Sequence, residues 1–91
     1  HYVYCLQSLK NAKLYIGSTS DLRRRVAEHN RRHGGSFTEK NGPWKLVFYE
    51  AHQNKKDASE MELFYKTGYG REVLQGKLKH YFASLNFGGS Q

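Results

Sequence analysis

The sequence predicts a mixed α/β (α+β) domain in which a small three-stranded antiparallel sheet is flanked by helices, in the order β-β-α-β-α-α. Two observations support this prediction. Short runs rich in β-branched and aromatic residues are interspersed with segments whose apolar residues recur at helical spacing. The chain has 91 residues, which suffices for one compact core. We assign a single domain to residues 1–85 and a flexible C-terminal tail to residues 86–91.

The first half of the chain is predicted to form a hairpin followed by a helix. Residues 2–6 and 14–17 are strand-like, and the short polar segment between them favours an antiparallel hairpin. The Ser-Thr-Ser-Asp sequence that ends at Asp21 supplies helix N-caps. A helix is therefore predicted over residues 21–32, and the His-Gly-Gly sequence at residues 33–35 ends it.

The second half is predicted to hold one strand and two helices. Residues 36–43 are expected to form a loop, and residues 44–51 (Trp-Lys-Leu-Val-Phe-Tyr-Glu-Ala) make the strongest strand signal in the chain. Asn54 is a suitable cap for a helix over residues 55–67. The Gly-Tyr-Gly that follows is expected to break this helix, and a last helix is predicted over residues 71–85.

Charge and cysteine content narrow the classes of partner. Lys and Arg number 15 against 8 acidic residues, so the net charge of +7 favours an anionic partner: nucleic acid, a phosphorylated ligand or an anionic membrane surface. The single cysteine, Cys5, excludes an intramolecular disulfide and a cysteine-based zinc site. No apolar run approaches the ~20 residues of a membrane span. We expect a cytoplasmic monomer without membrane association.

Helical geometry singles out three charged or titratable side chains. Arg25 and His29 are four residues apart and lie beside Leu22 and Val26, on the inward side of their helix. A charge in that position needs a partner or a ligand. Glu62 borders the apolar stripe of the next helix and is therefore half-buried, so it either pairs with Arg25 or binds a cation.

The predicted hairpin also carries two tyrosines. If Tyr4 pairs near Tyr15, their phenols form one patch. Considered without any family, such a pair is more often part of a core, with its hydroxyl groups at the edge.

These residues follow one another in an order typical of a known family. Tyr-Val-Tyr at residues 2–4, Tyr-Ile-Gly at residues 15–17, Arg25 and His29 resemble the motifs of the GIY-YIG nucleases, and Glu62 follows at the expected place. The first motif departs from Gly-Ile-Tyr but keeps its tyrosine. The resemblance covers about residues 2–81 and is greatest to small stand-alone bacterial members.

This resemblance implies a phosphodiesterase that uses one divalent ion, Mg²⁺ or Mn²⁺. It assigns the metal ligand to Glu62 and the scissile phosphate to Arg25. Tyr4 and Tyr15 would orient or deprotonate the attacking water, with Tyr4 as the preferred base and His29 as an assistant or an alternative base. Arginine suits phosphate because its planar fork matches two oxygens at once, and a hard carboxylate suits Mg²⁺.

The sequence therefore predicts a metal-dependent endonuclease that hydrolyses DNA with little sequence specificity and acts on branched or single-stranded DNA; RNA is a further possible substrate. The alternatives are a non-catalytic nucleic-acid-binding module on the same fold and, less favoured, an interaction protein that uses its last helix. Gly17 and Ser18 would let backbone and phosphate approach closely at the start of the first helix. The expected contacts to the nucleic-acid backbone are Arg23, Arg24, Arg31, Arg32 and Lys66.

Overall fold

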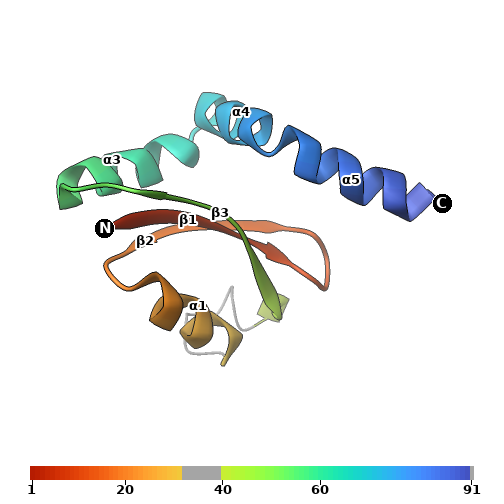
Figure 1. Ribbon diagram of the computed structural model, residues 1–91, viewed down its shortest axis with the longest axis horizontal. Coiled ribbons are helices and arrows are strands. Elements are labelled where there is room, and N and C mark those ends of the chain that lie inside the picture. Colours follow the sequence, from red (N-terminus) through yellow and green to blue (C-terminus); the bar gives the residue numbers. More distant parts are fainter. Residues whose placement is uncertain (32–39, 91) are drawn as a thin grey trace.

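The computed structural model describes residues 1–31 and 40–90, with side chains through residue 85. Three strands and four helices account for most of this part of the chain, and Figure 1 shows their arrangement. They are β1 (Tyr2–Ser8), β2 (Leu14–Thr19), α1 (Leu22–Asn30), β3 (Trp44–Ala51), α3 (Lys55–Tyr65), α4 (Gly68–Lys77) and α5 (Lys79–Ser90).

The three strands form one antiparallel sheet in the order β2-β1-β3, which confirms the predicted sheet. β1 is the central strand, so β2 is free along its outer edge within the described residues. In the hairpin, Tyr4 lies opposite Gly17 and Leu6 lies opposite Tyr15. Because side chains alternate along a strand, Tyr4 and Tyr15 point to the same face as diagonal neighbours.

The sheet separates two layers of helices. α1 covers one face and α3 and α4 cover the other (Figure 1). The core under α1 consists of Tyr4, Leu6 and Trp44, against which Leu22 and Val26 of the helix pack. The core on the opposite face is larger and contains Val3, Cys5, Ile16, Ala58, Tyr65, Leu74 and Leu78.

The helices after β3 differ from the prediction. The helix expected over residues 71–85 is two helices, α4 and α5, so the order is β-β-α-β-α-α-α. The Gly-Tyr-Gly sequence forms the first turn of α4 instead of a break, because the Thr67 hydroxyl caps this turn by accepting from the Gly70 backbone N–H at 3.0 Å. Gly70 fits there because a Cβ would lie 1.7 Å from the Phe64 carbonyl oxygen.

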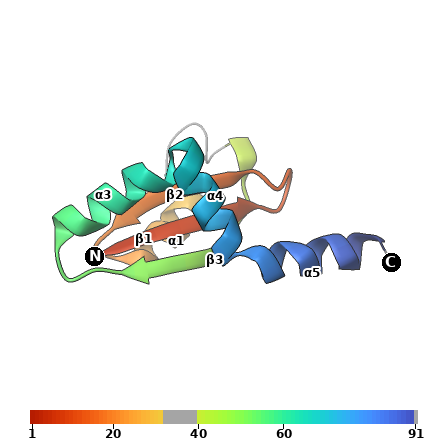
Figure 2. The same cartoon turned by 90° about the horizontal axis from the view of Figure 1, so that it is seen from above.

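The C-terminal end also differs from the prediction. α5 continues through Ser90, so residues 86–90, which we assigned to a tail, are helical. Figure 2 shows α5 extending beyond the end of the sheet. Leu74 and Leu78 are buried whereas Leu85 is 43% exposed, so the apolar residues of the segment predicted as the last helix are buried only near its start. Within residues 1–31 and 40–90, no helix is long and apolar enough to cross a membrane.

Candidate active site

Three aromatic side chains, of which two are buried and Tyr15 is half-buried, form a cluster between the sheet and α1. Tyr4 projects from the central strand and is 1% exposed. Its hydroxyl group lies 2.9 Å from Nε2 of His29, which is equally buried. Tyr15 completes the cluster, with its ring centroid 6.4 Å from that of Tyr4 and 4.9 Å from that of His29. The two phenols therefore meet, as the sequence predicted, in a diagonal arrangement.

Local interactions at both ends of α1 hold His29 in place. Asp21 caps the start of the helix by accepting from the Arg24 backbone N–H at 3.1 Å. Near the other end, Asn30 binds both backbone groups of Trp44: its Oδ1 accepts at 2.7 Å and its Nδ2 donates at 3.1 Å. The end of α1 is therefore attached to the start of β3, and His29, one residue before Asn30, is directed under the sheet.

The environment keeps His29 neutral. Burial lowers its pKa from the ordinary value, and the positive charge of Arg25 lowers this pKa further. Nδ1 is buried and has no hydrogen-bond partner within the described residues, whereas Nε2 faces Tyr4. The Tyr4 hydroxyl is therefore the hydrogen-bond partner of the His29 ring in the described part of the chain.

The pKa of the Tyr4 phenol depends on burial and on charged side chains from the helices on both faces of the sheet. Burial is the largest cause that raises the pKa of Tyr4, to about 12, and Tyr15 and Glu62 raise it further. The Arg25 guanidinium lowers this pKa in part. Tyr4 is therefore protonated at neutral pH, and it lies within electrostatic range of both the guanidinium and the carboxylate that the sequence singled out.

Arg25 lies at the border of the core under α1, as its position on the helix predicted. Its side chain is 30% exposed, and Nη1 lies 3.0 Å from Oε1 of Glu28, one turn along the same helix. Burial would lower the pKa of Arg25, but the bond with Glu28 and the neighbouring phenols raise it overall. The sequence analysis missed Glu28, although the three-residue spacing signals such a pair.

Glu62 extends from α3 on the opposite face of the sheet. Its Oε1 accepts from the Ser18 hydroxyl at 2.5 Å, and its Oε2 lies 2.8 Å from Nζ of Lys66. Burial would raise the pKa of Glu62, but the bonds from Lys66 and Ser18 lower it overall. The carboxylate is therefore ionised and oriented. Within the described residues, its ion pair is with Lys66 and not with Arg25, which was the alternative left open.

The site spans the edge strand β2. Gly17 faces the α1 side, next to Tyr4, while the following residue, Ser18, faces α3 and holds Glu62. Arg25 thus approaches from one face and Glu62 from the other, and both act on the phenol beside Gly17. The functional groups therefore lie on both faces of the sheet rather than on one, and the neighbouring residues Gly17 and Ser18 of β2 contact one group on each face.

Gly17 and Ser18 act differently from the sequence-based expectation. A Cβ at Gly17 would lie 2.6 Å from Oη and 2.8 Å from Cζ of Tyr4, so the space that glycine leaves is filled by the phenol and not by backbone or substrate. The Ser18 hydroxyl donates a hydrogen bond to Glu62, whereas we expected it to contact a phosphate. Both residues therefore position other side chains of the site.

The expected nucleic-acid contacts occupy different settings. Arg23 and Arg31 are exposed on α1 and at its C-terminal end. Arg24 is also exposed and lies 3.9 and 3.8 Å from two carboxylates, those of the N-cap and of the last turn of α1. Lys66 is 45% exposed at the end of α3. Arg32 lies outside the described residues.

The donor set suits one kind of metal ion. Within residues 1–31 and 40–90, no three His, Cys, Asp or Glu side chains come together. A zinc site needs three or four such ligands, whereas Mg²⁺ keeps several waters and uses one or two carboxylates together with substrate oxygens. A single ionised carboxylate on the partly exposed edge of β2, Glu62, fits the second case.

The fold and this constellation of tyrosine, arginine, histidine and glutamate define a catalytic domain of the GIY-YIG class. The family model described as the GIY-YIG catalytic domain matches residues 1–77, and the chain belongs to this family. At the level of the family, the domain is that of a nuclease, a hydrolase of the endonuclease type.

Among individual proteins, the chain is similar in sequence and structure to UPF0213 proteins. It is 39% identical over 75 residues to a UPF0213 protein of Clostridium perfringens, with 82% of this chain and 80% of that protein covered. A UPF0213 protein of Haloquadratum walsbyi is 37% identical over 75 residues, 82% of each chain. The solution NMR structure of a UPF0213 protein from Bacillus halodurans aligns with a TM-score of 0.52 at 33% identity, covering 84% of this chain and 82% of that one.

Proposed function

We propose that the protein is a divalent-metal-dependent endonuclease that hydrolyses DNA phosphodiester bonds with little sequence specificity. One observation supports this proposal above all others. The buried Tyr4 phenol contacts a neutral imidazole and is within range of a guanidinium on one side and a carboxylate on the other. A proton-transfer group, a cation for phosphate and a metal ligand are the three parts that phosphodiester hydrolysis requires.

Glu62 is the residue that would hold Mg²⁺ or Mn²⁺. The bound ion would supply positive charge to neutralise the oxygens of the phosphodiester as negative charge develops. The Glu62 carboxylate is ionised and can therefore bind the ion, since Ser18 and Lys66 both lower its pKa. Ser18 also fixes its orientation at the edge of β2.

Arg25 is placed to bind the scissile phosphate. Its guanidinium is partly exposed and its only ion pair within the described residues is with Glu28 on its own helix. This pair holds the side chain along α1 while leaving further N–H groups of the fork for phosphate oxygens. A guanidinium fixed before the reaction stabilises developing charge without having to reorganise.

Tyr4 and His29 form a proton path. As the attacking water gives its proton to the Tyr4 oxygen, the phenol passes its own proton to Nε2 of His29 at 2.9 Å. Tyr4 stays neutral throughout, so its pKa of about 12 does not prevent the transfer. The lowered pKa of His29 keeps the imidazole neutral, and in the tautomer protonated at Nδ1 the Nε2 atom accepts this proton. Tyr15, against both rings, orients the pair.

Plasmid nicking tests this function. Supercoiled plasmid and branched DNA would be incubated with Mg²⁺ or Mn²⁺ and with wild type, Glu62→Gln, Arg25→Ala or Glu60→Gln. We expect the first two variants to lose at least ~100-fold in rate, the typical effect of removing one such stabilising group. Glu60→Gln is the matched control, because Glu60 is exposed on the same helix two residues away, and it should nick as wild type does.

Two results would contradict the proposal. Unchanged nicking by Glu62→Gln would remove the metal assignment. Absence of nicking by wild type on every substrate, with salt-sensitive DNA binding retained, would favour a non-catalytic binding module.

A further inference from the structure

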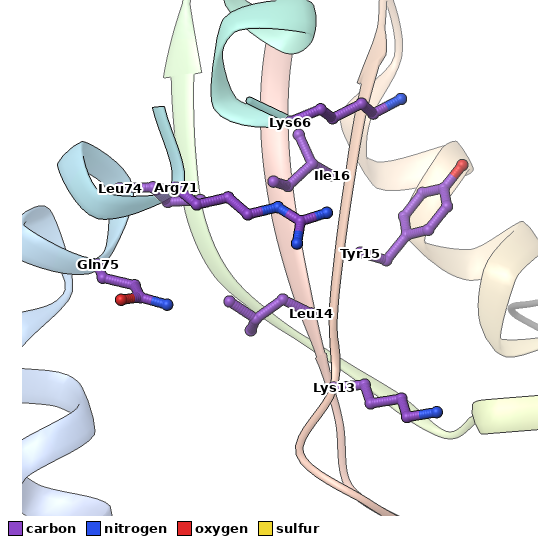
Figure 3. Close-up of a pocket in the computed structure, with 8 residues that line it drawn as sticks. All are labelled: Lys13, Leu14, Tyr15, Ile16, Lys66, Arg71, Leu74 and Gln75. Carbon is purple, nitrogen blue, oxygen red and sulfur yellow. The ribbon is translucent and has the colours of Figure 1, made fainter. Parts of the chain in front are cut away.

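A second feature of the molecule is a cavity of about 540 Å³ between β2 and α4, on the face of the sheet opposite α1 (Figure 3). Its floor is apolar and consists of Leu14 and Ile16 from the strand and Leu74 from the helix. This volume lies within the range of small-ligand sites, which combine an apolar lining with a few placed polar groups. Ile16 and Leu74 belong to the larger core and Leu14 packs against it, so packing within the protein holds the floor in place.

The rim of the cavity is cationic. Among the residues that the structure describes, Lys13, Lys66 and Arg71 line it and no acidic side chain does. Figure 3 shows Arg71 extending from α4 across the cavity toward β2. Within the described residues, the side chains of Lys13 and Arg71 form no ion pair, so their charges are not already neutralised. An apolar floor below unneutralised cations suits a ligand that joins a flat apolar body to an anion.

The cavity adjoins the candidate active site. Tyr15 lies between the two, because the residue lines the cavity while its ring points to the α1 side of β2 and packs against His29. Lys66 links them as well, since its ammonium group contacts Glu62 and its side chain lines the rim. If the scissile phosphate of a nucleic-acid strand lies at the edge of β2, the neighbouring nucleotide of that strand therefore reaches the cavity.

We propose that this cavity is a subsite for one unpaired nucleotide that flanks the cleaved bond, an inference that rests on the proposed nuclease function. The base lies on the floor of Leu14, Ile16 and Leu74, and the adjoining phosphate binds Arg71, which extends across the cavity. The Gln75 side chain, an amide at the cavity wall, donates to and accepts from the base edge.

This geometry selects the class of substrate. A base inside a duplex is paired on its edge and stacked on both faces, so it cannot enter a cavity without being extruded at a cost of a few kcal/mol. For a base in a single strand, a flap or a fork, entering the cavity costs far less free energy. The subsite therefore favours DNA that presents an unpaired nucleotide, without requiring any recognition of sequence elsewhere.

Binding without divalent metal tests the subsite independently of cleavage. Fluorescence anisotropy in EDTA would compare a labelled 12-nucleotide single strand with a blunt duplex of the same sequence. We expect Arg71→Ala to weaken single-strand binding roughly tenfold, the usual effect of losing one charge-assisted hydrogen bond, and to reduce the salt slope by about 0.7. Duplex binding should change less than about twofold, because the cavity stays empty.

A matched control separates the cavity from general charge. Lys56→Ala removes one positive charge from an exposed site on α3 outside the cavity, and it should affect both DNA forms equally and weakly. A strand carrying 2-aminopurine would report entry of the base, with a fluorescence change that Gln75→Ala and Arg71→Ala reduce.

The proposal is overturned if Arg71→Ala weakens both DNA forms to the same extent, or if wild type binds the blunt duplex as tightly as the single strand. Failure of the nuclease function would appear differently. In that case wild type would not cleave, while the Arg71 effect on metal-free single-strand binding would persist and support the subsite alone. Cleavage without any Arg71 effect would remove the subsite and leave the nuclease.

Discussion

Gly17→Ala is the smallest change that tests how the site is held together. A Cβ at this position would lie 2.6 Å from Oη of Tyr4, about 0.8 Å short of ordinary contact at 3.4 Å, and 2.8 Å from Cζ. The phenol cannot simply rotate away, because Tyr4 is 1% exposed and its ring packs against Tyr15 and His29. Either the ring or strand β2 must shift.

The size of the effect follows from this overlap. Overpacking a buried site by one methyl group costs roughly 1–3 kcal/mol, which alanine's better fit to a strand offsets by about 0.5–1 kcal/mol. Each kcal/mol lowers Tm by roughly 4–8 °C in a domain of this size. A shift near 0.8 Å also disturbs the 2.9 Å bond between Tyr4 and His29, and a displacement of about 1 Å at a reacting group costs ~100-fold in rate.

Thermal unfolding and plasmid nicking, measured on the same preparations, provide the assay. Gly76→Ala is the matched control, because nothing lies within 4 Å of a Cβ there; in the interior of α4 it should stabilise by about 0.5–1 kcal/mol. In a Tyr4→Phe background, where Oη is absent, Gly17→Ala should destabilise less, with a coupling of roughly 0.5–3 kcal/mol. If Gly17→Ala unfolds and nicks as wild type does, the close contact with Tyr4 does not govern this site.

Two further predictions concern titration. Ser18→Ala should raise the pKa of the Glu62 carboxyl toward its ordinary value, because one of the two bonds that lower this pKa is lost. A carboxyl-carbon NMR titration measures this pKa, and the control variant Ser59→Ala, at an exposed position, should leave it unchanged. An unchanged pKa in Ser18→Ala would contradict the assignment. The stability of the protein should fall as the pH drops below about 6.5, because the unfolded chain then binds a proton at His29 that the folded protein, with its lowered pKa, resists. The free energy of urea unfolding, measured at pH 7.5 and 5.0, should change less with pH in His29→Gln than in wild type. An equal change in both proteins would argue against the buried neutral imidazole.

The sheet and the inward side chains of α1 were predictable because both depend on short-range periodicity. Strand β3 matches its predicted bounds, 44–51, since Trp44 and the Val-Phe-Tyr sequence at residues 47–49 are typical of strands and no Gly or Pro interrupts the segment. Arg25 and His29 face inward because residues four apart share a helix face. Each of these inferences uses only neighbours in the chain.

The parts that sequence reasoning missed depend on contacts between distant elements. Gly70 lies in the first turn of α4 because it packs on the Phe64 carbonyl and because Thr67 caps that turn, so local propensity alone misplaces the break. The bond from Ser18 to Glu62 joins residues 44 apart. It depends on the hairpin register and on where α3 crosses the edge of the sheet, and neither is encoded in the neighbouring residues.

The buried imidazole is the strongest argument that this core serves chemistry as well as stability. His29 is 1% exposed and leaves Nδ1 without a hydrogen-bond partner in the described part of the chain. A buried polar atom in that state costs about 1–3 kcal/mol, and a leucine would fill the same layer without it. The cost is offset only if the imidazole does something that packing cannot. Its other nitrogen lies 2.9 Å from the Tyr4 hydroxyl, and exchanging a proton with that phenol is the role that we propose for it.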